Sequence, residues 1–190
     1  MRFTPRARLF VLATVVGSAA IVAAQTNGTP ERFSAAAINT NVGAAGSIDI
    51  VVDRWSSNAE SDKLLKAMAD EASEKVLDIV QDLPVKGYFN SPGSLRWDIH
   101  FARRAPLPDG GERVVLITDR RISFWEATNR PRSFDYPFTV IELRINRDGR
   151  GEGKLSVATK VIADGDMITL ENYDIQPVQL TNVKRERSSG

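Results

Sequence analysis

The chain has 190 residues, with 25 Lys and Arg, 24 Asp and Glu, one histidine and no cysteine. The absence of cysteine excludes thiol catalysis, cysteine-ligated zinc and stabilisation by disulfides. The charges alternate along the sequence and form no long basic block, which argues against a nucleic-acid partner.

Residues 1–24 have the layout of a cleavable export signal. A stretch with Arg2, Arg6 and Arg8 precedes an apolar run from Leu9 to Ala24 that ends in small residues. The run is shorter than the roughly 20 residues that a membrane-spanning helix needs. An uncleaved N-terminal anchor is the alternative.

We expect cleavage after Ala24, a periplasmic or secreted protein, and no stable membrane span once the signal is removed. Cleavage removes three arginines and no acid, so 22 basic side chains face 24 acidic ones, a net charge of −2. Residues 25–190 are long enough for a single globular domain with its own core.

Two strands are predicted first, over residues 32–39 and 47–55. In the second, Ile48, Ile50 and Val52 alternate with polar neighbours, which is typical of a strand with one buried face. After this strand the spacing of the apolar residues changes. Ser57 and Glu60 have the spacing of a helix capping box, and apolar residues follow at helical spacing as far as Val80. We interpret this segment as a helical hairpin on the sheet.

From residue 85 onward the segments are predicted to be extended. Leu95, Trp97, Ile99 and Phe101 are expected to share one buried face. The apolar run within residues 113–118 predicts a strand covered on both sides. Further strands are expected over residues 138–146, 154–162, 167–173 and 178–184, with residues 147–153 as a Gly-rich hairpin connection.

The pattern therefore predicts an α+β fold that is mainly antiparallel β, because the turns are too short for parallel crossovers. About eight strands form either a barrel or a sandwich, and the helical hairpin is inserted after the second strand.

Several segments carry a resemblance, namely Gly87-Tyr88-Phe89, Leu95-Arg96-Trp97-Asp98-Ile99-His100, Asp135-Tyr136-Pro137-Phe138-Thr139, Glu171-Asn172-Tyr173-Asp174 and Gln176-Pro177-Val178. They resemble segments of uncharacterised exported bacterial proteins, and the likeness covers most of the chain after the signal. It implies a recurring exported domain without implying an activity, a cofactor or catalytic residues.

Asp98 and His100 are the candidates for catalysis. His100 is the only histidine, so any imidazole proton relay must use it. Strand alternation places it on one face with Asp98 and Arg96, where a carboxylate can orient the imidazole. The alternative is a solvent-facing strand residue, because no serine lies in a Gly-x-Ser-x-Gly motif.

A second candidate site is the stretch of residues 119–137, which mixes arginines, aromatic residues and prolines. Guanidinium groups beside aromatic rings are typical of sites for sugars, acidic ligands or peptides. With Arg96, the candidate binding residues are Arg120, Arg121, Trp125, Arg130, Arg132 and Tyr136. The alternative is a loop that covers one end of the sheet.

We expect no metal site and no cofactor. One histidine and no cysteine make a zinc site unfavourable, and the turns at Asp148-Gly149 and Asp164-Gly165-Asp166 lack the spacing of a calcium loop. Three functions stay open: a non-catalytic binding or accessory domain for a small amphiphilic ligand or an envelope partner, a hydrolase that uses Asp98 and His100, and a structural or assembly protein of the cell envelope.

Overall fold

The computed structural model describes residues 29–40, 43–69, 73–93, 95–119, 139–157, 159–164, 167–173 and 176–186. The expected export signal and the stretch 120–138 lie outside these ranges. The strands are β1 (Glu31–Asn39), β2 (Ala44–Val52), β3 (Gly87–Asn90), β4 (Trp97–Pro106), β5 (Glu112–Thr118), β6 (Thr139–Ile145), β7 (Arg150–Val157), β8 (Thr159–Asp164), β9 (Met167–Tyr173) and β10 (Val178–Glu186). The helices are α1 (Asn58–Ala69) and α2 (Ser73–Asp82).

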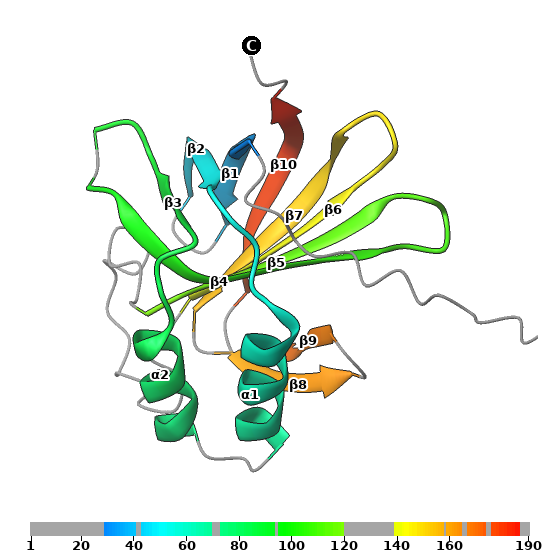
Figure 1. Ribbon diagram of the computed structural model, residues 1–190. Helices are drawn as coiled ribbons and strands as arrows, with labels where there is room; N and C mark the ends of the chain where they lie inside the picture. The colour runs from blue at the N-terminus through cyan, green and yellow to red at the C-terminus, as the bar shows by residue number, and fades with distance from the viewer. Residues whose placement is uncertain are drawn as a thin grey trace, which may run out of the picture.

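Eight strands form a closed antiparallel barrel in the order β1-β10-β7-β6-β5-β4-β3-β2, and β2 pairs with β1 to complete the ring. Strands β8 and β9 make a separate two-stranded sheet (Figure 1). The expected antiparallel architecture is confirmed. Of the two forms that the sequence left open, the observed strand pairing is that of a barrel.

The helical hairpin between β2 and β3 is also confirmed. Ser57 and Glu60 form the predicted capping box: the Glu60 N–H donates to Ser57 Oγ at 3.3 Å, and the Ser57 N–H donates to Glu60 Oε2 at 2.7 Å. This reciprocal pair satisfies N–H groups that a helix start leaves without partners. Both helices lie on one side of the barrel (Figure 1).

The core has two layers that share the wall formed by β4, β5 and β6. Within β5, Val114 and Leu116 belong to the cluster inside the barrel, whereas Val115 and Ile117 pack with the helices outside it. The prediction that this strand is covered on both sides is therefore confirmed. Helix residues Leu64 and Val80 are fully buried in the outer layer.

The expectation that Ile99 and Phe101 share a face is wrong. Ile99 pairs with Thr118 while Phe101 pairs with Ile117, so His100 is an extra residue in β4, a β-bulge. Ile99 consequently lies in the barrel interior and Phe101 packs under the helices. Leu95, expected in the same buried set, is 85% exposed.

Two strand boundaries also differ from expectation. The connection between β6 and β7 is only a turn at residues 146–149, because Gly151 and Gly153 belong to β7. A Cβ at Gly151 would lie 1.8 Å from the Arg144 carbonyl oxygen, so the close approach of β6 and β7 requires glycine there. The strand expected over residues 154–162 is divided between β7 and β8.

Candidate functional site

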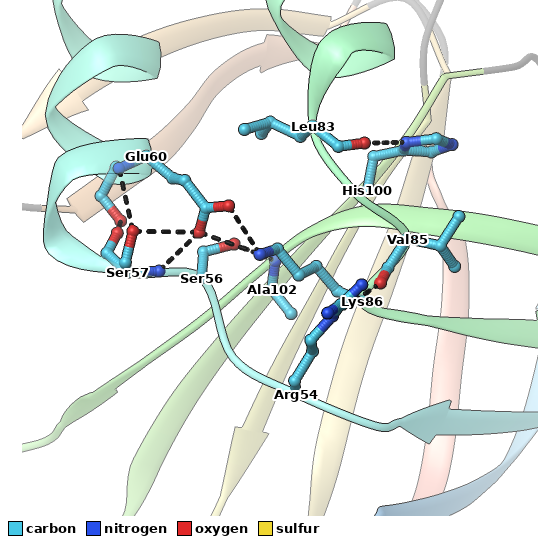
Figure 2. A network of polar contacts seen from close by, with 10 residues as sticks. Arg54, Ser56, Ser57, Glu60, Leu83, Val85, Lys86, His100 and Ala102 are labelled. Atoms are coloured by element: carbon cyan, nitrogen blue, oxygen red, sulfur yellow. Dashed lines mark hydrogen bonds and ion pairs between the residues drawn. The ribbon is translucent and has the colours of Figure 1, made fainter. Parts of the chain in front are cut away.

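His100 projects from the bulge toward the end of α2. Its Nδ1 lies 2.8 Å from the carbonyl oxygen of Leu83 (Figure 2). A carbonyl oxygen only accepts hydrogen bonds, so Nδ1 carries a proton. Nε2 is the second nitrogen of the ring. Nε2 lies 3.8 Å from Oδ1 of Asp119, which makes Asp119 the carboxylate beside the imidazole.

The other two candidates nearby are exposed: Asp98 lies in β4, and Arg96 comes immediately before it. Asp98 is exposed and pairs across strands with Tyr88. The Arg96 guanidinium lies 3.3 Å from the centroid of the Tyr88 ring, a cation–π contact. The structure thus associates Arg96 with the Tyr88 ring, and associates His100 with Leu83 and Asp119.

A buried ion pair lies close to this histidine. Lys86 Nζ is 2.7 Å from Oε1 and 2.9 Å from Oε2 of Glu60, and the Lys86 side chain is 4% exposed (Figure 2). Partial burial acts to raise the pKa of Glu60, but the hydrogen bonds from Lys86 and Ser57 and the charge of Lys86 together lower it below its ordinary value. Glu60 therefore stays ionised as the partner of a buried ammonium.

The polar groups around this pair join the helices to the barrel. Ser56 Oγ accepts a hydrogen bond from the Ala102 N–H at 3.1 Å, and Ser61 Oγ accepts one from Arg103 at 2.6 Å. These serine hydroxyls are engaged in holding α1 against β4. The arrangement is that of a structural junction.

One end of the barrel is closed by ionic contacts. Glu31 accepts hydrogen bonds from Arg104 at 2.9 Å and from the Trp55 indole at 3.2 Å, and its second oxygen lies 3.4 Å from Nε of Arg185. Arg185 also donates to Glu112 at 2.5 Å. Alternation along the strands points these side chains inward, so they cover the apolar interior at this end.

The barrel interior itself is occupied by packed side chains. Eighteen buried hydrophobic residues form the inner cluster, with Trp55 and Trp97 packed against it. The rings of Phe89 and Trp97 stack with centroids 5.2 Å apart. An eight-stranded barrel has an interior just wide enough for its side chains, so this filling favours recognition on the outer surface over enclosure of a ligand.

The outer wall of the barrel is rich in cations beside the area that the helices cover. Six basic and three acidic residues point outward from β5, β6, β7, β10 and β1, an excess of three positive charges. We call this surface the basic face; it comprises Arg32, Arg113, Glu142, Arg144, Arg150, Glu152, Lys154, Lys184 and Glu186. The helices pack on the same outer side of β5 and β6, at the other end of these strands, against Val115, Ile117 and Val140.

Two pairs of like charges lie directly opposite one another on this face. Arg113 pairs with Arg144 across β5 and β6, and Arg150 pairs with Lys184 across β7 and β10. Glu142 lies between the first two arginines, 3.0 Å from Arg113 and 3.4 Å from Arg144. Across β6 and β7 Arg144 also lies opposite Glu152, and Lys184 lies 3.0 Å from Glu186. Directly opposed like charges destabilise a sheet, and these acidic neighbours offset part of that cost.

The basic face was not predicted from the sequence, because its residues come from five separated strands. The one local sign was the alternation of Arg150, Glu152 and Lys154, which places all three on one face of a strand. The predicted binding residues Arg120, Arg121, Trp125, Arg130, Arg132 and Tyr136 lie outside the described residues.

In the part of the chain that the structure describes, no group of three or more histidine or acidic residues is arranged to hold a metal ion. None of the described helices is long and apolar enough to cross a membrane. No family model, curated protein or solved structure matches this chain.

Proposed function

We propose that this chain is an exported, non-catalytic binding domain that engages an acidic partner protein through the basic face. The observation that carries the proposal is the pair of cation–cation oppositions on the outer wall, Arg113 with Arg144 and Arg150 with Lys184. An acidic partner would turn both oppositions into favourable contacts.

The exposure of these side chains supports this role. The Arg144 side chain is 61% exposed and lies 3.4 Å from Glu142, and that of Lys184 is 51% exposed and lies 3.0 Å from Glu186, so a partner can reach both. Arginine is enriched at protein interfaces, where its planar guanidinium binds carboxylates through two hydrogen bonds. The filled barrel interior supports binding on the surface in place of a small amphiphilic ligand held inside.

The proposal is tested with a labelled polyglutamate peptide as the acidic probe, by fluorescence anisotropy at several salt concentrations. We expect binding that weakens as salt rises, because screening shortens the range of the attraction. The double variant Arg144→Glu/Arg150→Glu should bind at least about tenfold more weakly. The control is Lys63→Glu/Lys66→Glu, which makes the same charge change at two exposed positions of α1 and should bind within about twofold of the parent.

Equal weakening by both double variants would show that net charge alone attracts the probe, and would overturn the assignment to this face. Failure to bind polyglutamate even at about 20 mM salt, where screening is weak, would also overturn it. Duplex DNA and vesicles with anionic lipids are measured in parallel. Stronger binding to either one, lost in Arg144→Glu/Arg150→Glu, would assign the face to a different class of partner.

A further inference from the structure

Four exposed cations of the basic face lie on four adjacent strands of the barrel. Arg144 lies on β6 and Arg150 on β7, and the next two strands carry one each, Lys184 on β10 and Arg32 on β1. We call these four side chains the cation row. Because alternation along each strand points them outward, the row crosses the strands on the outer surface of the wall.

The centre of the row is a close pair of cations. Arg150 lies opposite Lys184, and at the neighbouring position the Arg185 N–H donates to the Gly149 carbonyl at 2.7 Å. Arg150 and Lys184 are thus a non-hydrogen-bonded pair, in which Cα atoms are about 4.5 Å apart and the side chains are close together. Two cations at this separation can hold one carboxylate between them.

The two outer members of the row are diagonal neighbours of this central pair. Arg144 lies opposite Glu152, two residues from the pair along β7, and Arg32 lies opposite Glu186, two residues from the pair along β10. Diagonal neighbours are about 7–8 Å apart. Residues on one side of an extended peptide repeat about every 7 Å, so such a peptide can place successive carboxylates along the row.

The acidic residues of the face leave the centre of the row positive. Glu152 and Glu186 lie opposite the outer members, and Glu186 also lies 3.0 Å from Lys184. Within the part of the chain that the structure describes, the Arg150 side chain makes no ion pair. A carboxylate of a partner therefore gains most at Arg150.

The row follows a curved surface. Strands β6, β7, β10 and β1 are half of the eight strands that close the barrel, so the four side chains fan out around the wall (Figure 1). A straight helix touches a convex wall only over a short length. An extended chain bends with the wall and can reach from Arg144 to Arg32.

We infer that the acidic partner binds through an extended segment that crosses these four strands, with aspartate or glutamate at alternate positions and one carboxylate held between Arg150 and Lys184. This inference rests on the proposed function, to which it adds the conformation and the residue pattern of the bound segment.

The first test compares cations of the same strand and the same face. Lys154 is exposed on β7, but it lies opposite Glu142 and outside the row. Arg150→Gln should bind polyglutamate at least about fivefold more weakly than the parent, and Lys154→Gln, with the same charge change, within about twofold of it. Lys184→Gln should match Arg150→Gln, because both side chains hold the same carboxylate, and it reports on the site if Arg150→Gln does not fold.

The second test varies the probe at constant composition and charge. One labelled peptide is Glu-Thr repeated four times, and the other is four glutamates followed by four threonines. When extended, the first places four carboxylates on one side over roughly 20 Å, whereas the second places four on alternate sides over about 10 Å. We expect the alternating peptide to bind at least about threefold more tightly, while long-range attraction alone would not favour it.

Equal losses in Arg150→Gln and Lys154→Gln would overturn the inference and leave the basic face as the binding site. Equal binding of the two peptides, or tighter binding of the one with consecutive glutamates, would do the same. Absence of polyglutamate binding at about 20 mM salt is a different result, because it removes the proposed function and the inference together.

Discussion

Lys86 and Glu60 are 26 residues apart in the chain, and the Lys86 ammonium lies within 2.9 Å of both carboxylate oxygens of Glu60. Lys86 lies just before β3 and Glu60 in the first turn of α1, so the pair ties the helical layer to the barrel. Because the Lys86 side chain is almost completely buried, the charge on each partner depends on the other.

Removal of one partner should therefore be costly. We expect Glu60→Gln to lower the free energy of unfolding by about 2–4 kcal/mol, because it leaves a buried ammonium without its counter-ion. The matched control is Glu60→Gln/Lys86→Met, in which no charge remains buried and most of the loss should be recovered. Urea denaturation of both variants measures the difference. A Glu60→Gln protein as stable as the parent would show that the ion pair does not hold the helices.

The same pair predicts a dependence of stability on pH. The pKa of Glu60 is lower in the folded protein than its ordinary value of 4.5. Its contribution is thus fully present above the unfolded pKa and is lost as the pH falls through the folded pKa. Urea midpoints measured from pH 7 down to pH 3 should fall in the parent, and by less in Glu60→Gln.

Glu186 contributes in the same direction, because its hydrogen bonds from Ser34 and Lys184 lower its pKa. The variant Glu186→Gln separates this contribution from that of Glu60. Because Glu186 is at the surface, its share should shrink at high salt, while the share of Glu60 should persist. A Glu60→Gln profile parallel to the parent would contradict the assignment to Glu60.

His100 should be structural rather than catalytic if its main task is the bond to Leu83. The side-chain amide of asparagine reaches the position of Nδ1, whereas that of glutamine reaches the position of Nε2. We expect His100→Gln to lower the free energy of unfolding by about 1–2 kcal/mol more than His100→Asn, because it leaves the Leu83 carbonyl without its donor. Equal losses in urea denaturation would show that the ring packs there without a specific bond.

We expect the cations of the basic face to lower the stability of the fold and to strengthen binding of an acidic partner. Replacing Arg150 by threonine removes the charge that opposes Lys184, and we expect a gain of about 0.2–0.5 kcal/mol in the free energy of unfolding. The same variant should bind the polyglutamate probe more weakly. As a control, Glu152→Gln removes a charge of opposite sign from the same strand and should strengthen probe binding. A variant Arg150→Thr that loses stability would show that the opposition is compensated within the fold.

The ionic end of the barrel gives a prediction independent of both proposals. Glu31 is a partner of Arg104, Trp55 and Arg185, and Glu31→Ala should lower the free energy of unfolding by about 1–3 kcal/mol, because it removes the acceptor of several donors at once. Asp109→Ala, on the loop at the same end, is the control and should cost less. Thermal unfolding of both variants measures the two losses, and equal losses would contradict the prediction.

The sequence alone determined the features that depend on neighbouring residues. The capping box of Ser57 and Glu60, the helical hairpin and the double burial of residues 114–117 all follow from spacings within one turn or one strand, where the side-chain period is set by the backbone. The antiparallel connectivity followed from short turns for the same reason.

Only the tertiary structure decided the features that depend on pairing between distant strands. The bulge at His100 reverses the face of every later residue of β4, and alternation in one strand cannot reveal an insertion relative to its partner. Pairing of β1 with β10 closes the barrel, and the register between β7 and β10 places Arg150 opposite Lys184. Charges that alternate along the chain thus gather on one wall, because the register of strand pairing, set by the whole core, determines which side chains become neighbours.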